Sequence, residues 1–500
     1  MLQAFIHLIL PILLLSISAA LAQNANKGVV VCYFSNWAVY RPGKGSYGIK
    51  DFPAETCTHG IYSFIGLNAA NSQVQILDQE LDVNRKGFLN FANMKNQYPN
   101  LKTLVAIGGW NEGAKKYSDM SADKNKRAAF VQSIVAFLKQ YNFDGLDLDW
   151  EYPGAGDRGG APADKANFVK LVEELRAAFD REGRGWELTM ATGAAPNRLQ
   201  DGYDIPALSK SIDFFNIMTY DLRGSWTGFA DVHSPLFKKP YETADYLALN
   251  VHDVLANWEK LGCPANKLVV GIPFYGRSFT LASASQNKIL GATIPTVGSG
   301  SAGAFTGEGG LLAYYEICGK DQGWTRNWDN DGKVPYAYKG NQWVGYEDEK
   351  SVQAKMDFIK QKGYRGGMVW AIDLDDFQGT CGPKNPLVSV MAKNMASYTV
   401  PGVSATTPSR NPISSPLPNV PQVSPTKPAP VAPTKPQPTS NMPLPDCSSS
   451  SFAPHKNCGK FYQCVYGRAV EMNCQPGLSF NAQVNICDWP ANNPRPECRQ

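Results

Sequence analysis

Short apolar runs recur along most of the chain, and amphipathic stretches separate several of them. Runs rich in Val, Ile and aromatic residues are typical of buried strands. Between two of them Phe130, Ile134 and Leu138 recur every four residues, which predicts a helix with one apolar face. The runs expected to form strands are 29–34, 59–64, 102–107, the acidic stretch 143–153, 187–192, 214–219, 268–273 and 367–372.

The alternation of strands and helices predicts an α/β fold with parallel strands and crossover helices. Eight strand–helix units favour a (β/α)8 TIM barrel. A doubly wound open sheet is the alternative. No glycine-rich phosphate fingerprint follows the first run, which weakens that alternative.

A long insertion separates the seventh and eighth runs, from about residue 278 to 366. It contains the strand-like segments 313–317, 334–338 and 342–346. We therefore expect an inserted α+β subdomain that forms one wall of a cleft at the barrel mouth.

The N-terminal residues are apolar and end in the small-residue pattern Ala20-Leu21-Ala22. This pattern favours a cleaved signal peptide over residues 1–22, and a membrane anchor is the alternative. No later segment is long and apolar enough to span a bilayer. We expect a secreted protein with no membrane contact after cleavage, whose barrel occupies residues 23–400.

The last hundred residues change character twice. Residues 401–445 are rich in Pro, Ser and Thr and contain no acid, which predicts an extended linker. Residues 446–500 hold six of the eleven cysteines, which predicts a small β module stapled by three disulfides. The spacing alone allows fifteen pairings.

The stretch 143–153 contains a row of acidic residues that a catalytic role explains better than exposure to solvent. Its acids Asp147, Asp149 and Glu151 alternate with apolar residues, so a strand places all three acids on one face. A solvated edge strand is the simpler reading, but its bulky apolar face argues against it. Asp144 has the wrong parity, and we expect a structural role for it.

The acidic stretch resembles the D-x-x-D-x-D-x-E signature of glycoside hydrolase family 18, the chitinases and their lectin relatives. Other segments resemble animal chitinases of that family in the same order, namely 32–37, 107–111, 218–221, 275–279 and 368–377. The C-terminal module resembles a peritrophin-A type chitin-binding domain.

The resemblance implies substrate-assisted, retaining hydrolysis of β-1,4 bonds between N-acetylglucosamine units by an endo-acting enzyme. Glu151 is then the proton donor, and Tyr220 orients the attacking acetamido carbonyl of the substrate. The charge of Asp149 is expected to raise the pKa of Glu151. Asp149 also stabilises the oxazolinium intermediate, and Asp147 shares a proton with Asp149.

The resemblance also implies substrate contacts. Asp221 would hold the substrate, Met218 would line the site, and Trp370 would form the floor. Further expected cleft contacts are Tyr33, Phe64, Trp37, Trp110, Trp226, Tyr275, Arg277 and Glu308. The implied disulfides are Cys32–Cys57, Cys318–Cys381, Cys447–Cys464, Cys458–Cys498 and Cys474–Cys487, which leaves Cys263 as a free thiol.

The expected partners are chitin and chitooligosaccharides. The net charge of +4 does not suggest nucleic acid, and the five histidines show no metal-ligand spacing, so no metal or cofactor is expected. We expect a monomer. Ala106 stands where many relatives have Ser; we expect this change to be tolerated, with altered hydrogen bonding of the inner acids as its possible effect. The alternatives are a non-catalytic chitin-binding lectin, disfavoured because Glu151 is present, and a structural protein of cuticle or matrix.

Overall fold

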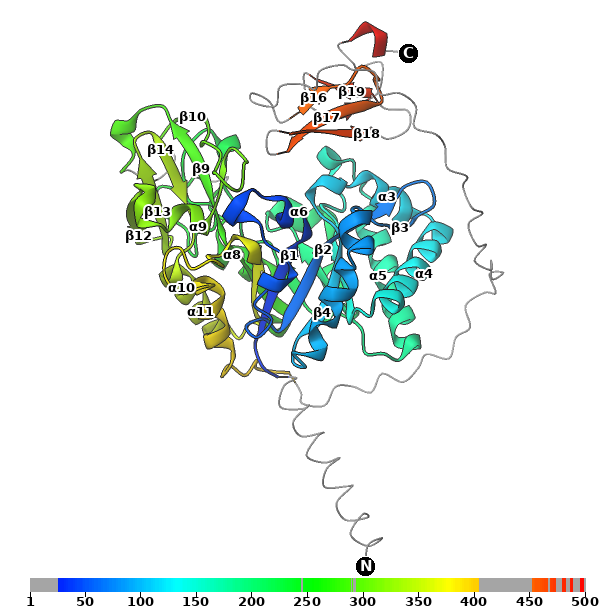
Figure 1. Ribbon diagram of the computed structural model, residues 1–500. Helices are drawn as coiled ribbons and strands as arrows, with labels where there is room; N and C mark the ends of the chain where they lie inside the picture. The colour runs from blue at the N-terminus through cyan, green and yellow to red at the C-terminus, as the bar shows by residue number, and fades with distance from the viewer. Residues whose placement is uncertain are drawn as a thin grey trace, which may run out of the picture. The chain divides into compact units, whose positions relative to one another are not determined.

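The computed structural model describes residues 26–243, 246–288, 290 and 294–403, and parts of the C-terminal module. Those parts are 452–465, 468–473, 479–482, 486–488 and 495–498. The predicted signal peptide and nearly all of the predicted linker lie outside the described residues. The chain divides into two compact units, one before and one after residues 414–415, and each is treated by itself (Figure 1).

Eight parallel strands form a closed barrel in the first unit (Figure 1). The first strand pairs with the last on one side and with the second on the other, which closes the sheet. This closure confirms the predicted TIM barrel and excludes the open sheet. The barrel strands are β1 (Val29–Ser35), β2 (His59–Asn68), β4 (Lys102–Gly108), β5 (Gly145–Asp149), β6 (Glu187–Thr192), β7 (Phe215–Ile217), β8 (Leu268–Pro273) and β15 (Gly366–Trp370).

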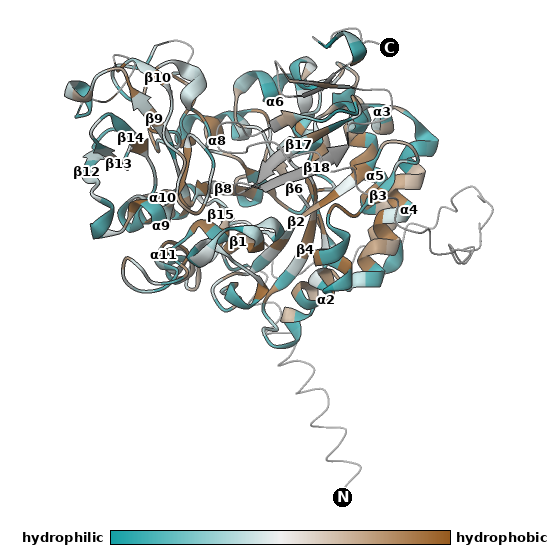
Figure 2. Cartoon of the chain, turned by 45° about the horizontal axis from the view of Figure 1, so that its top comes forward, coloured by the Kyte–Doolittle hydropathy of each residue, from teal (hydrophilic) through white to brown (hydrophobic). Residues whose placement is uncertain are grey.

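Helices cover the outside of the barrel with their apolar faces. Phe130, Ile134 and Leu138 of α4 are buried, as their spacing predicts. Asp123 caps this helix by accepting from the backbone N–H groups of its first turn. Figure 2 shows apolar residues along the barrel strands and along α4 and α5. The outer helices are α2 (Gly87–Ala92), α3 (Lys115–Ala122), α4 (Lys124–Tyr141), α5 (Asp164–Glu182), α6 (Pro196–Gly202), α7 (Ile205–Leu208), α8 (Val251–Lys260), α10 (Glu349–Lys362) and α11 (Pro386–Met395).

The insertion between β8 and β15 forms an antiparallel sheet with its own apolar core around Phe279 and Trp343. The sheet begins at Tyr275, three residues earlier than the predicted boundary, and ends at Gly345, after which α10 joins the outer helices. Its strands are β9 (Tyr275–Leu281), β10 (Thr296–Ser299), β11 (Leu311–Ala313), β12 (Thr325–Asp329), β13 (Val334–Lys339) and β14 (Gln342–Gly345).

The strand predicted over 313–317 is wrong. Strand β11 ends at Ala313, and α9 (Tyr314–Ile317) follows at once. The physical reason is Glu316, whose carboxylate accepts from the N–H of Ala313 and from the backbone N–H groups of Phe305 and Thr306. These bonds close a helical turn where an apolar sequence alone suggested a strand.

Disulfides are present at three of the expected pairs. Cys32–Cys57 joins β1 to the turn before β2, and Cys318–Cys381 joins the insertion to the segment after β15. Cys458–Cys498 lies in the second unit. Cys447 and Cys474, one partner of each of the two remaining expected pairs, lie outside the described residues. Cys263 is buried and free.

The second unit is a small β module. Its strands β16 (Phe452–Pro454), β17 (Lys460–Val465) and β18 (Arg468–Asn473) form an antiparallel sheet, and β19 (Ser479–Asn481) pairs with β20 (Ile486–Asp488). The rings of Phe461 and Phe480 stack with their centroids 4.6 Å apart. Within the described ranges of both units, no helix has the length and apolarity that a membrane span requires.

Candidate active site

Strand β5 carries the acid row into the barrel interior. Asp147 and Asp149 are buried on the strand, and Glu151 follows two residues beyond its end. The apolar residues of the other face point outward, where the Trp150 ring packs against Phe168 of α5 with centroids 5.2 Å apart. The alternation in the sequence thus sets the acids inside and the apolar side chains against the helices. Functional sites of such barrels lie at this carboxyl end of the strands.

Asp147 is the deepest acid and is fully hydrogen-bonded. Its Oδ2 accepts from the Tyr33 hydroxyl at 2.6 Å, and its Oδ1 accepts from Thr189 at 2.5 Å and Asn216 at 3.1 Å. Burial raises the pKa of Asp147 to about 6, and these donors oppose the rise. The neighbouring strands differ, because Ala106 beside it on β4 offers no hydroxyl whereas Thr189 on β6 does.

Asp149 differs from Asp147 in having an unused oxygen. Its Oδ1 is buried and has no hydrogen-bond partner in the described part of the chain. Burial first, and then the charges of Glu151 and Asp147, raise the pKa of Asp149 well above its usual range. The structure gives no direct hydrogen bond from Asp147 to Asp149 within the described residues, and proton sharing between them stays a prediction. Asp149 is therefore a buried carboxyl with a raised pKa and one oxygen free of hydrogen bonds among the described residues.

Glu151 has the properties of a proton donor near neutral pH. Burial raises the pKa of Glu151 to about 7, Tyr152 and Arg158 oppose the rise, and the charge of Asp221 adds to it. The expected cause was the charge of Asp149. Burial is instead the main cause of the raised pKa of Glu151, and the charge of Glu151 in turn raises the pKa of Asp149.

A second wall of the site follows β7, which is two strands from β5 in the sheet. Tyr220 is buried with its hydroxyl 3.8 Å from the sulfur of Met368, and Met218 is partly buried beside the core. Asp221 accepts from the Tyr275 hydroxyl at 2.7 Å and from Arg277 Nε and Nη2 at 2.7 and 2.6 Å. Burial alone would raise the pKa of Asp221, but Arg277 outweighs it and holds that pKa well below its usual range.

Tyr275 and Arg277 were expected as cleft contacts, and the structure gives both a defined partner in Asp221. Both lie on β9, so this wall joins the barrel to the insertion. Glu308 of the insertion is exposed, and the charges of Arg277 and Asp221 act on it.

A cluster of aromatic rings lies at the end of β15. The Trp370 ring lies 5.7 Å from Phe64 in a stacked arrangement and 6.3 Å from Trp37, measured between centroids. Trp37 stacks on Phe64 at 6.0 Å and remains 40% exposed. Tyr33 meets Trp370 edge-on at 5.5 Å but is only 1% exposed. Tyr33 is thus buried against Trp370, and its direct contact with substrate stays a prediction.

Two further tryptophans offer open faces at the rim. Trp110 is 57% exposed and Trp226 is 62% exposed. The Arg158 guanidinium lies 3.7 Å from the centroid of the Trp110 ring, and its Nε donates to the carbonyl of Glu151 at 3.3 Å. Arg277 lies 5.5 Å from the Trp226 ring. Arginine thus fixes the orientation of both exposed rings.

Asn216, Thr189 and Arg158 were not found from the sequence. The first two are ordinary barrel residues whose contact with Asp147 depends on which strands become neighbours. Arg158 follows the acidic stretch in a loop without a recognisable pattern. Asp144 has the structural role expected of it, since it accepts from Lys95 at 2.6 Å and from the Thr103 N–H at 2.9 Å.

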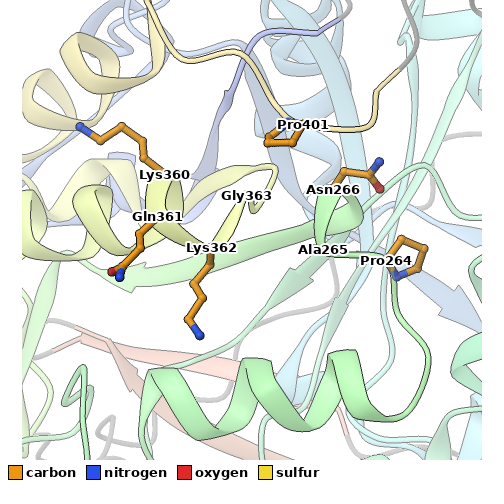
Figure 3. Close-up of a pocket in the computed structure, with 8 residues that line it drawn as sticks. All are labelled: Pro264, Ala265, Asn266, Lys360, Gln361, Lys362, Gly363 and Pro401. Carbon is orange, nitrogen blue, oxygen red and sulfur yellow. The ribbon is translucent and has the colours of Figure 1, made fainter.

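Two other features of the described chain resemble ligand sites. Within the described residues, Cys318, Asp376 and Cys381 have metal-like proximity, but their sulfurs form a disulfide. A hollow of about 360 Å³ lies between the turns 264–266 and 360–363, next to Pro401 (Figure 3). These turns precede β8 and β15, so the hollow lies at the end of the barrel away from the acid row.

Fold and site together define a (β/α)8-barrel hydrolase with a row of buried carboxyl groups. Residues 29–375 match the family model of glycosyl hydrolases family 18, and residues 447–498 match that of the chitin-binding peritrophin-A domain. The chain belongs to glycosyl hydrolase family 18.

Relatives align along nearly the whole chain. An endochitinase of Manduca sexta is 48% identical over 96% of this chain and 98% of its own length. Chitotriosidase-1 of Mus musculus is 36% identical over 94% of this chain and 97% of its own.

Solved structures agree with the barrel. A Group IV chitinase of Ostrinia furnacalis in complex with allosamidin is 40% identical, with a TM-score of 0.71 over 74% of this chain and 100% of its own. Human YKL-39, described as a pseudo-chitinase with retained chitooligosaccharide binding, is 36% identical with a TM-score of 0.68 over 74% of this chain and 100% of its own.

Proposed function

We propose that this protein is an endo-acting chitinase that hydrolyses β-1,4 bonds between N-acetylglucosamine units with retention of configuration. The observation that supports this mechanism is the placement of the carboxyl groups and their hydrogen-bond partners. Asp147, Asp149 and Glu151 come from one strand, and Asp221 opposite them is held by Arg277 and Tyr275. An ordinary retaining glycosidase needs a free carboxylate nucleophile across the bond. Here the substrate's acetamido carbonyl takes that role.

The first step cleaves the glycosidic bond. Glu151 gives its proton to the glycosidic oxygen, which leaves with the bonding electron pair as the sugar hydroxyl. The acetamido carbonyl oxygen attacks the anomeric carbon and forms an oxazolinium ion. Tyr220 donates a hydrogen bond to that carbonyl oxygen, and the free oxygen of Asp149 accepts from the acetamido N–H.

The second step restores the enzyme. Glu151, now a carboxylate, takes a proton from a water molecule that attacks the anomeric carbon and opens the oxazolinium ring. Two inversions give net retention. Asp147 stays beneath Asp149 in its three hydrogen bonds and keeps the strand end in place.

A non-catalytic lectin is the main alternative. The human neighbour described as a pseudo-chitinase has the same fold, so the fold does not separate the two functions. The residues at this site do, because Glu151 with a pKa near 7 and the unpaired oxygen of Asp149 would be costly to bury in a protein that only binds. A structural matrix protein would leave the same groups unexplained.

The remaining parts of the proposal concern the whole chain. Residues 1–22 act as a signal peptide and the protein is secreted, which the disulfides support. The secreted protein acts as a monomer. Residues 23–400 form the catalytic domain, 401–445 a linker, and 446–500 a module that adsorbs to chitin. The peritrophin-A match over 447–498 supports the last assignment.

The experiment that tests substrate assistance compares two hexamers. The N-acetylglucosamine hexamer is expected to be cut, with the β-anomer of the new reducing end appearing first by proton NMR. The glucosamine hexamer lacks the acetamido carbonyl and is expected to remain intact. Initial release of the α-anomer, or comparable cleavage of both hexamers, would contradict the mechanism.

A further inference from the structure

His233 lies directly behind the wall that carries Tyr220 and Asp221. It belongs to the segment between β7 and α8, and only 1% of it is exposed. Its ring packs against the Tyr275 ring with centroids 5.0 Å apart. No motif pointed to this residue in the sequence, and the mechanism above gives it no task.

The hydrogen bonds of His233 determine which ring nitrogen carries the proton. The N–H of Asp221 donates to Nδ1 at 3.3 Å, and Oδ1 of Asp221 lies 3.4 Å from the same nitrogen. In a neutral ring with its hydrogen on Nε2, Nδ1 is the acceptor of that N–H. Nε2 lies 3.2 Å from the carbonyl oxygen of Tyr275, which can only accept, so Nε2 carries the hydrogen. The ring is therefore the neutral Nε2–H tautomer.

His233, Asp221 and Tyr275 form a closed circuit of hydrogen bonds. Asp221 donates its N–H to His233, His233 donates to the carbonyl of Tyr275, and the Tyr275 hydroxyl donates back to the Asp221 carboxylate at 2.7 Å. The carbonyl of His233 also accepts from the next N–H, that of Leu222, at 3.0 Å. One residue thus binds two consecutive amides of the turn that follows Tyr220.

That turn needs such support. Asp221 has a φ of 55°, a left-handed conformation that a residue with a Cβ adopts at an energetic cost. A turn of this kind persists when its surroundings over-determine it. Two interactions supply this constraint. The backbone N–H groups of Asp221 and Leu222 donate hydrogen bonds to His233, and Arg277 forms an ion pair with the Asp221 carboxylate.

We propose that His233, as the neutral Nε2–H tautomer, is a positioning residue that fixes the left-handed turn at Asp221 and thereby the place of Tyr220 opposite Glu151. This role rests on the proposed function, since Tyr220 has to meet the acetamido carbonyl in line with the anomeric carbon. The essential element is an acceptor at the position of Nδ1.

The surroundings of His233 keep the ring neutral. Burial lowers the pKa of His233, the carboxylate of Asp221 opposes this, and the positive charges of Arg277 and Lys355 add to the lowering. Tyr275 faces the ring from β9 as an uncharged phenol. The Nδ1 acceptor is therefore available throughout the neutral pH range.

Two amide substitutions separate positioning from packing. His233→Asn puts its amide oxygen where Nδ1 lies, so it accepts from the Asp221 N–H. His233→Gln carries the same amide one methylene further, at the level of Nε2, and loses that acceptor. We expect kcat of the Asn variant on the N-acetylglucosamine hexamer to stay within about threefold of the parent, and that of the Gln variant to fall by roughly tenfold or more with little change in KM.

Thermal unfolding of both variants and the activity of Glu151→Gln are measured alongside. Equal kcat in the two folded variants, whether high or low, would overturn the positioning role. If the Gln variant does not fold, the Asn variant decides alone, and a tenfold loss of its kcat would refute the role. An active Glu151→Gln enzyme would instead refute the proposed function, while the contrast between Asn and Gln would still report on His233.

Discussion

The Tyr33 hydroxyl donates a hydrogen bond to Asp147 Oδ2 at 2.6 Å across the interior of the barrel. It joins β1 to β5, two strands separated in the sheet by β4 and β2 on one side. Asn216 of β7 reaches the same pair, with its Nδ2 3.2 Å from the Tyr33 oxygen. The lowest acid of the row is thus held from three directions, and the phenol that holds it lies beneath Trp370 rather than in the cleft.

Removing this hydroxyl should impair catalysis more than substrate binding. In Tyr33→Phe the ring still packs under Trp370, but Asp147 loses a donor and its pKa rises further above about 6. We expect kcat to fall roughly tenfold with KM nearly unchanged, and unfolding to become easier by about 2 kcal/mol. Tyr47→Phe is the control, since the buried Tyr47 hydroxyl has no partner among the described residues. Equal kcat in both variants would show that the Asp147 contact is dispensable.

The alkaline limb of the activity profile should follow Glu151. A proton donor must be protonated, so a pKa raised to about 7 leaves activity intact below that value and lowers it about tenfold per unit above it. The charge of Arg158 lowers the pKa of Glu151. We therefore expect Arg158→Gln to move the alkaline limb of kcat/KM to higher pH.

The control for this shift is Arg184→Gln, which removes an exposed arginine beside Trp186. Its profile should match that of the parent. An alkaline limb that stays in place in Arg158→Gln, or moves equally in both variants, would show that Arg158 does not tune the donor.

Trp110 should act on long substrates. Its exposed ring, held by Arg158, offers an apolar face to a sugar. Trp110→Ala is expected to weaken binding of long oligosaccharides by about 1 kcal/mol, or roughly fivefold in KM, with the melting temperature unchanged. The control is Trp328→Ala. It removes a ring on strand β12 of the insertion that lies under Lys350 of α10. A KM that rises for the control but not for Trp110→Ala would contradict this placement.

The C-terminal module should be separable from catalysis. The barrel includes Val400, whose N–H donates to the carbonyl of Asn26 at 2.8 Å, so the chain is best cut after Val403. The truncated enzyme is expected to cleave the soluble hexamer at the parent rate and to adsorb less to insoluble chitin. A depletion assay on chitin powder measures this, and equal adsorption of the two forms would exclude a binding role for the module.

The sequence predicted those features of the site that depend on local order. The alternation of acids and apolar residues in 143–153 fixed the inward face of β5, because a strand repeats every two residues. It did not reveal Thr189, Asn216 or His233, whose roles depend on contacts between segments far apart in the chain. The same limit explains why the sequence did not predict the main cause of the raised pKa of Glu151. That cause is burial, which is a property of the folded barrel.

The central claim is that Glu151 is the proton donor, and Glu151→Gln tests it most directly. Glutamine keeps the shape of the side chain and removes the transferable proton. The measurement is the initial rate of oligosaccharide release from the N-acetylglucosamine hexamer at pH 6, with hexamer affinity determined in parallel. We expect a loss of about a thousandfold in kcat with affinity within a few-fold of the parent. Release of products at the parent rate would contradict the mechanism.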